Sequence, residues 1–204
     1  MPNFRPFAHP WWVNLFLLVP LLAYLLFRRK QPRLTSHSLL ACAVFALSFG
    51  FVEGAIAIYL GAALGLLPAS AGTLSDLVRL APDIDGAQAQ QFGNLLPGGL
   101  LTVEVIREAA TMLMLLSVAI LAVEKWRERF AIFLWTFALW DTAYYISLWG
   151  MVRWPNSPIS VDVLFLIPVP WIAQVWFPIL VSILTLVVVL LTRNRRSHDL
   201  EFRY

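Results

Sequence analysis

Long apolar runs dominate this sequence, and they constrain its fold more than any other feature. The run from Leu100 to Val123 contains only three charged residues, Glu104, Arg107 and Glu108. A mostly apolar run of about 18 residues or more is long enough to cross a bilayer as a helix. The chain is 60% hydrophobic and 13% charged, whereas soluble domains are about 45–50% apolar and about 25% charged. We therefore predict an all-α, polytopic integral membrane protein with a single domain over residues 1–204.

Five transmembrane helices fit the apolar runs and the breaks between them. We expect them at about residues 11–27, 38–67, 100–123, 130–149 and 171–192. Residues 68–98 then form a long extracytoplasmic loop. Proline inside a membrane helix bends it where neighbouring groups satisfy the freed carbonyl. Pro20 therefore predicts a kink in the first span, and Pro178 predicts a bend in the last.

A proline-rich stretch precedes the expected last helix. Residues 163–171 are apolar, but Pro168 and Pro170 interrupt them. Because proline removes a backbone donor and clashes with the preceding turn, this stretch is too broken for a regular span. We interpret it as an interfacial or partly re-entrant segment.

The basic residues predict the orientation of the chain. The connections after the first and third spans and the C-terminal tail carry eleven of them: Arg28, Arg29, Lys30, Arg33, Lys125, Arg127, Arg129, Arg193, Arg195, Arg196 and Arg203. The opposite side carries Arg5, Arg79 and Arg153. The positive-inside rule then places the N-terminus outside and the C-terminus in the cytoplasm, and we expect a bacterial cytoplasmic (inner) membrane. Because this asymmetry accounts for the net charge of +3, we predict lipid and not nucleic acid as the partner.

A charged stripe on the third span marks the candidate site. Glu104, Arg107, Glu108 and Thr111 are spaced i, i+3, i+4 and i+7, so they share one helix face. Each charged group costs about 2.5–3.5 kcal/mol at the centre of a membrane helix, even on the lenient insertion scale. Such groups persist when they face protein or water, which makes an intramembrane ionisable residue a functional hypothesis.

Two other spans place carboxylates at similar depths. Glu53 lies in the second span and Asp141 in the fourth. We therefore expect one acidic cluster that opens toward the extracytoplasmic face, with the segment 154–171 and Asp162 as its roof. Arg107 cannot neutralise four carboxylates, so we expect either bound protons or bound cations. A purely structural ion pair of Arg107 with one carboxylate is the alternative.

Candidate roles follow from the chemistry of these side chains. Acid–base catalysis would use Glu104, Glu108 and Asp141. Substrate binding would use Arg107, Thr111, Tyr144, Tyr145 and Trp154. A metal would be held by Glu53, Glu104, Glu108 and Asp141. Either tyrosine alone is more often a packing residue, and we assign no site role to Trp140 among the nine tryptophans.

The residue types restrict the cofactor. His9, His37 and His198 lie at or beyond span ends, which argues against haem ligation inside the membrane. A carboxylate site without histidine suits a hard divalent cation such as Mg²⁺, Ca²⁺ or Mn²⁺, or protons. The sequence contains no helical di-iron Glu-x-x-His motif and no hydrolase or phosphate-loop motif.

Small residues on the second span predict close helix packing. Gly50 and Gly54, and then Gly61 and Gly65, have GxxxG spacing, which lets a second helix approach closely. We favour packing within the chain over a homodimer through this face. Three function classes remain: a small transporter or a transporter subunit, which we favour; a membrane enzyme acting on a lipid or apolar substrate; and a non-catalytic subunit of a larger complex.

Overall fold

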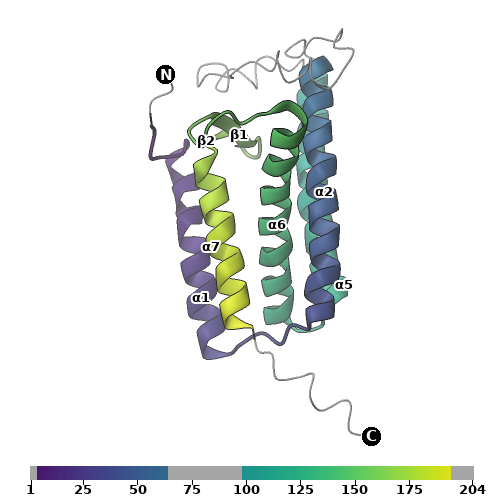
Figure 1. The fold of residues 1–204 in the computed structure, drawn as a ribbon, viewed down its shortest axis with the longest axis vertical. Coiled ribbons are helices and arrows are strands. Elements are labelled where there is room, and N and C mark those ends of the chain that lie inside the picture. Colours follow the sequence, from purple (N-terminus) through teal and green to yellow (C-terminus); the bar gives the residue numbers. More distant parts are fainter. Residues whose placement is uncertain (1–3, 64–97, 194–204) are drawn as a thin grey trace, which may run out of the picture.

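The computed structural model describes residues 4–63 and 98–193. It is a bundle of roughly parallel and antiparallel helices with a small β-hairpin at one end (Figure 1). Gly65 and the predicted loop 68–98 lie outside these residues, except for Gly98, which is the first residue of a helix. Three helical segments are long and apolar enough to cross a membrane: Trp11–Arg29, Ser36–Ala62 and Gly98–Ala122. The membrane and helical parts of the prediction are thus supported.

The first apolar segment combines two kinds of helix. It begins as a 3₁₀ helix, η1 (Trp11–Leu18), and continues as α1 (Val19–Arg29). Pro20 is the second residue of α1. Backbone N–H groups in the first turn of an α-helix have no acceptor within the helix, so proline is tolerated there. The predicted irregularity therefore takes the form of a change in helix type beside Pro20.

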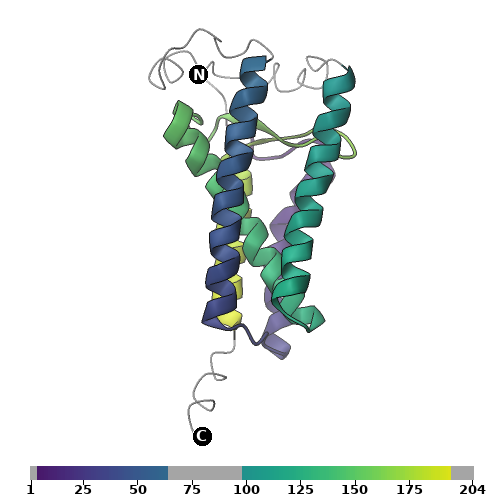
Figure 2. The ribbon, with the colours of Figure 1, turned by 90° about the vertical axis from the view of Figure 1, so that its right-hand side faces the viewer.

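Helix α6 (Trp126–Val152) is the centre of the bundle. It packs against α2 (Ser36–Ala63), α5 (Gly98–Ala122) and the last helix, α7 (Trp176–Thr192), and α1 covers the other side of α7. Figure 2 shows α2 and α5 side by side in front of the other helices. The central position of α6 explains its many buried residues, because its neighbours cover it on several sides.

The predicted last span, 171–192, is wrong at its beginning. Trp171–Gln174 forms strand β2, which pairs antiparallel with β1 (Val161–Phe165), and α7 starts only at Trp176. The proline-broken stretch is therefore the tip of a hairpin, and the fold is not purely α-helical. Pro168 and Pro170 prevent a helix there, while the β-branched and aromatic residues beside them favour strands. Pro178, the third residue of α7, sits in its first turn and breaks no internal hydrogen bond.

The N-terminal segment extends the hairpin. His9 and Ile172 exchange two backbone hydrogen bonds, of 2.8 and 2.7 Å. The N–H of Val175 donates to the carbonyl of Ser160, at 2.9 Å. These bonds hold the hairpin across the ends of η1, α6 and α7, so that it closes this end of the bundle.

The glycine face of α2 packs within the chain. A Cβ atom at Gly50 would lie 2.6 Å from the carbonyl oxygen of Trp140 and 2.7 Å from Cβ of Ala143, both on α6. At Gly54 the nearest atom, Cβ of Ser147, would be at 3.2 Å. Within the chain, α6 thus occupies the face of α2 that carries Gly50 and Gly54.

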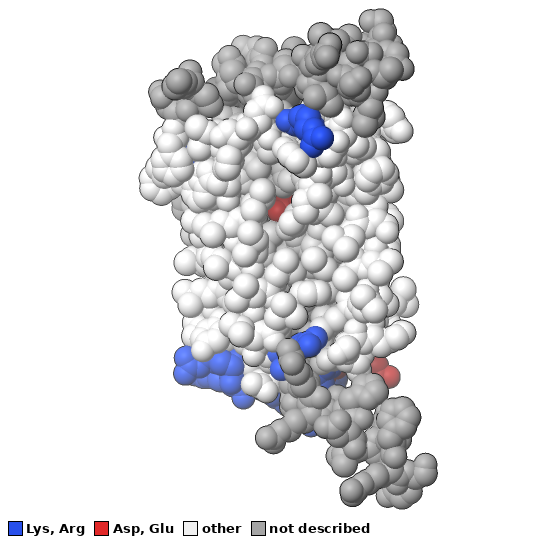
Figure 3. All heavy atoms as spheres, viewed as in Figure 1, with Lys and Arg blue, Asp and Glu red and all other residues white. Residues whose placement is uncertain are grey.

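The basic loops meet at the end opposite the hairpin. Arg127, at the start of α6, donates to the carbonyl of Leu26 in α1 at 3.0 Å. Arg28, Arg29, Lys30 and Arg33 lie beside Lys125 and Arg127 around one surface hollow. Figure 3 shows Lys and Arg gathered at the lower end of the molecule, below a broad band that is almost free of charge. The structure thus has one strongly basic end.

Candidate functional site

A cavity of about 250 Å³ lies at the hairpin end of the bundle. Its walls come from η1, α2, α5, α6 and α7, and residues 161–166 and Trp171 of the hairpin region line it as well. On the basic side, a fully packed apolar layer that includes Phe27, Ile132 and Val189 closes the bundle. The cavity therefore lies between the roof and the middle of the helices.

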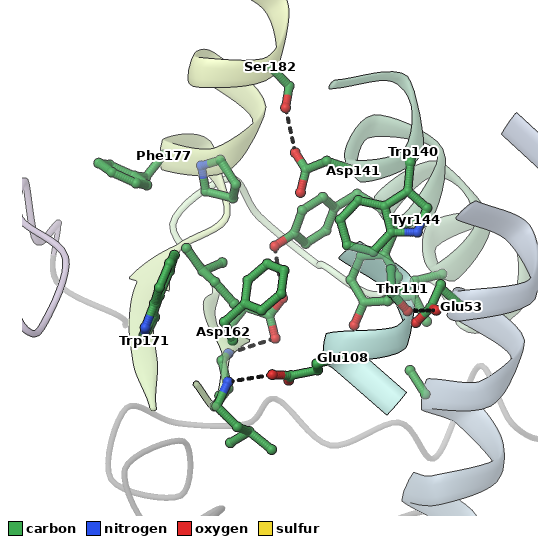
Figure 4. A pocket seen from close by; sticks show the side chains of 18 of the residues that line it. Glu53, Glu108, Thr111, Trp140, Asp141, Tyr144, Asp162, Trp171, Phe177 and Ser182 are labelled. Atoms are coloured by element: carbon green, nitrogen blue, oxygen red, sulfur yellow. Dashed lines mark hydrogen bonds between the residues drawn. The ribbon is translucent and has the colours of Figure 1, made fainter. Parts of the chain in front are cut away.

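Every predicted site residue lines this one cavity. They are Glu53, Glu104, Arg107, Glu108, Thr111, Asp141, Tyr144, Tyr145 and Trp154. They come from three helices and the segment that follows α6, as the overlapping depths along the spans predict. Figure 4 shows Glu53, Asp141, Tyr144 and Glu108 approaching the same region from α2, α6 and α5.

Arg107 is held between two carboxylates. Its Nε donates to Glu104 at 3.0 Å and its Nη2 to the other oxygen of Glu104 at 2.6 Å. Its Nη1 pairs with Glu53 on α2. Thr111 donates its hydroxyl to the second oxygen of Glu53, at 2.7 Å. Glu104, Arg107 and Thr111 thus connect α5 to α2. The positive charge of Arg107 is compensated by Glu53 and Glu104.

Glu108, the remaining stripe residue, faces the hairpin. Its carboxylate accepts the backbone N–H of Leu166 at 2.8 Å, and the residue is buried. The bond joins the middle of α5 to the chain that follows β1. The sequence does not predict this contact. It depends on the β-hairpin, which cannot be recognised within the apolar run.

Two aspartates line the opposite part of the cavity. Asp141 on α6 accepts the hydroxyl of Ser182 on α7 at 2.7 Å. Asp162 on β1 accepts the hydroxyl of Tyr145 at 2.8 Å and the N–H of Val163 at 2.8 Å. Burial raises the pKa of the Asp162 carboxyl to about 6, against the opposing effect of these two hydrogen bonds. Asp162 was expected only in the roof, and the structure makes it a cavity residue.

The predicted metal site is not formed. Within residues 4–63 and 98–193, no three Asp, Glu, His or Cys side chains converge closely enough to hold an ion. The reason lies in the pairing: Glu53 and Glu104 bind Arg107, Glu108 binds a backbone N–H, and Asp141 binds Ser182. The four carboxylates share a cavity but do not share a coordination centre.

Three indole groups on the cavity wall lack hydrogen-bond partners. The buried Nε1 atoms of Trp140, Trp154 and Trp171 have none among the described residues. Trp140 is 8% exposed and Trp154 9%. A buried N–H without an acceptor costs about 1–3 kcal/mol, so such donors are typical of a site that receives a ligand. Sequence reasoning missed Trp140 and Trp171, since tryptophan is also common in membrane belts and cores.

The fold and the cavity together define a helical membrane protein with an acidic and aromatic cavity beneath its hairpin. Comparisons with protein-family models, with curated proteins and with solved structures found no match for the chain.

Proposed function

We propose that this chain is a five-span transporter, or the substrate-binding unit of one, with its N-terminus outside and its C-terminus in the cytoplasm. The basic end would face the cytoplasm under the positive-inside rule. The cavity and its hairpin roof would then face the extracytoplasmic side. Helix α7, with 17 residues, is at the short end of the range that spans a bilayer.

The observation that carries this proposal is the charge of the cavity. Five carboxylates line it, from Glu53, Glu104, Glu108, Asp141 and Asp162, and Arg107 is the one cationic side chain among the lining residues. Isolated buried charges cost far more than a fold can absorb, so such groups bind protons or cations instead. Binding and release of a cation or proton inside a helical bundle is the central step of secondary transport.

Access from both sides is the property that tests the proposal. A cavity-lining thiol is introduced as Ser182→Cys on a Cys42→Ala background, because Cys42 is the chain's single cysteine. Transport requires this thiol to react with a membrane-impermeant cationic thiol reagent in right-side-out vesicles and also in inside-out vesicles. Ser117→Cys is the control, since Ser117 lies on the exposed, apolar surface of α5 and should react from neither side.

A membrane enzyme acting on a lipid or apolar substrate is the second candidate. It is favoured by the hairpin roof, together with the tightly packed layer that separates the cavity from the basic end. An enzyme needs access from one side only. Labelling of Ser182→Cys from the outside alone, under every ligand and pH condition, would contradict transport and favour this reading. Labelling from neither side would contradict both.

A further inference from the structure

We infer that the cavity binds a small organic cation that also carries a hydrogen-bond acceptor. This inference rests on the proposed cation-binding function and names the chemical class of the ligand. It is carried by three features of the cavity wall: carboxylates without a cationic partner, a lining of aromatic rings, and unpartnered indole donors.

The first feature is uncompensated negative charge. Arg107 is engaged by Glu53 and Glu104. Asp141 and Asp162 have hydroxyl and backbone donors, and neither forms an ion pair among the described residues. Figure 4 shows both aspartates reaching the cavity, from α6 and from β1. A ligand with one positive charge would give Asp141 and Asp162 the cationic partner that they lack among the described residues.

The second feature is the aromatic lining. On one wall, Phe165 contacts Trp171 at 5.3 Å and Trp140 at 6.4 Å between ring centroids. On the other, Tyr145 contacts Tyr144 at 5.1 Å and Trp154 at 6.3 Å. Aromatic faces attract ammonium groups through the ring quadrupole, most strongly when the cation is desolvated. Such walls suit an alkylated ammonium and offer little to an inorganic ion, which needs several oxygen ligands at close range.

The third feature sets the polar requirement. The Nε1 atoms of Trp140 and Trp154 belong to residues more than nine-tenths buried, and they have no acceptor among the described residues. Indole can only donate. A hydroxyl, ether or carbonyl oxygen on the ligand would accept from one of them. The volume of about 250 Å³ is below the range of about 300–1,000 Å³ typical of sites for drug-sized ligands, which points to a small cation.

Calorimetric titration of the full chain in lipid nanodiscs tests the inference, with empty nanodiscs as the blank. The probe is benzyldimethyl(hydroxyethyl)ammonium, which has a positive charge, an aromatic ring and an acceptor oxygen. Its carbon isostere, with a quaternary carbon in place of the nitrogen, has the same shape and no charge. We expect the ammonium compound to bind at least about tenfold more tightly than the isostere.

Matched variants locate the binding. Asp162→Asn and Asp141→Asn should each weaken binding of the ammonium probe about tenfold and change binding of the isostere little. Glu124→Gln removes an exposed carboxylate near the basic end and should change neither.

Two results would overturn the inference. Equal binding of the ammonium compound and its isostere would mean that charge is not recognised. Ammonium binding that both aspartate variants leave unchanged would place the probe outside the cavity. If either occurs while Ser182→Cys is labelled from both sides, the ligand class is wrong and the transport proposal survives. One-sided labelling together with tight ammonium binding would instead overturn transport and keep the ligand class.

Discussion

The cavity residue Asp162 lowers the stability of the folded chain when its carboxyl group is ionised. Asp162 lies on the short strand β1, and its carboxylate accepts the hydroxyl of Tyr145. Its pKa is raised above 3.8, to about 6, chiefly by burial. The ionised form is therefore less favourable in the folded chain than in the unfolded chain. Natural proteins tolerate such costs at functional positions.

This placement predicts a pH-dependent effect of Asp162→Asn on stability. Well below pH 3.8 the carboxyl is protonated in both the folded and the unfolded chain, so the substitution should change the unfolding temperature little. Between about pH 4 and about pH 6 the unfolded chain loses this proton while the folded chain keeps it, so the wild type loses stability relative to the variant, by at most about 3 kcal/mol. Thermal unfolding in detergent from about pH 3 to about pH 8 measures the difference. Glu124→Gln is the control, and an Asp162→Asn effect independent of pH would contradict the prediction.

The spacing of single residues predicted which side chains share the cavity wall but not how they pair. The i, i+3, i+4, i+7 pattern placed Glu104, Arg107, Glu108 and Thr111 on one face, and the structure places them all on the cavity wall. Nothing in that pattern separates Glu104, which binds Arg107, from Glu108, which binds the N–H of Leu166. The difference arises because the hairpin reaches only one side of α5, and a helical period contains no information about a distant strand.

At the scale of elements, the long apolar helices follow from composition, whereas the hairpin does not. Between Trp171 and Val181 the sequence contains one polar side chain, Gln174, and periodicity alone cannot separate a short buried strand from the start of a helix. The antiparallel register joins residues that are 6 to 13 positions apart, from the pair Phe165 and Trp171 to the pair Val161 and Gln174. The predicted span 171–192 contains the whole of α7 (Trp176–Thr192), and both end at residue 192.

The contact between α2 and α6 yields a graded prediction for glycine substitutions. Gly50→Ala places a methyl group 2.6 Å from a backbone oxygen and 2.7 Å from Cβ of Ala143, so the helices must separate. We expect a loss of about 1–3 kcal/mol, the usual cost of overpacking. Gly54→Ala, at 3.2 Å from a side chain, should cost less.

Gly150→Ala is the matched control for this series. Nothing lies within 4 Å of its added Cβ, and alanine is a better helix former than glycine by about 1 kcal/mol. Reversible unfolding in mixed micelles measures the three variants. If Gly50→Ala and Gly150→Ala had equal stability, α2 and α6 would not be in the close contact described here.

At the scale of the whole molecule, the most informative feature is the separation of the two ends. Eight basic residues of the described chain belong to the end without the hairpin: Arg28, Arg29, Lys30, Arg33, Lys125, Arg127, Arg129 and Arg193. Arg5 and Arg153 belong to the hairpin end. The sequence alone predicted this division, because segments rich in basic residues alternate with segments poor in them along the chain. The cavity below the hairpin could not be predicted in this way, because it depends on packing between distant segments of the chain.

This division predicts the sidedness of the protein when it is expressed in a bacterial cytoplasmic membrane. On a Cys42→Ala background, Arg5→Cys and Lys30→Cys each introduce one thiol at an exposed position, at opposite ends of the first helical segment. An impermeant thiol reagent added to intact cells should label Arg5→Cys at once and Lys30→Cys only after the membrane is permeabilised. Each substitution removes one basic residue, so the 11-to-3 asymmetry changes to 11-to-2 or 10-to-3 and keeps its direction. The reverse labelling pattern would place the cavity toward the cytoplasm, and any ligand would then have to reach it from inside the cell.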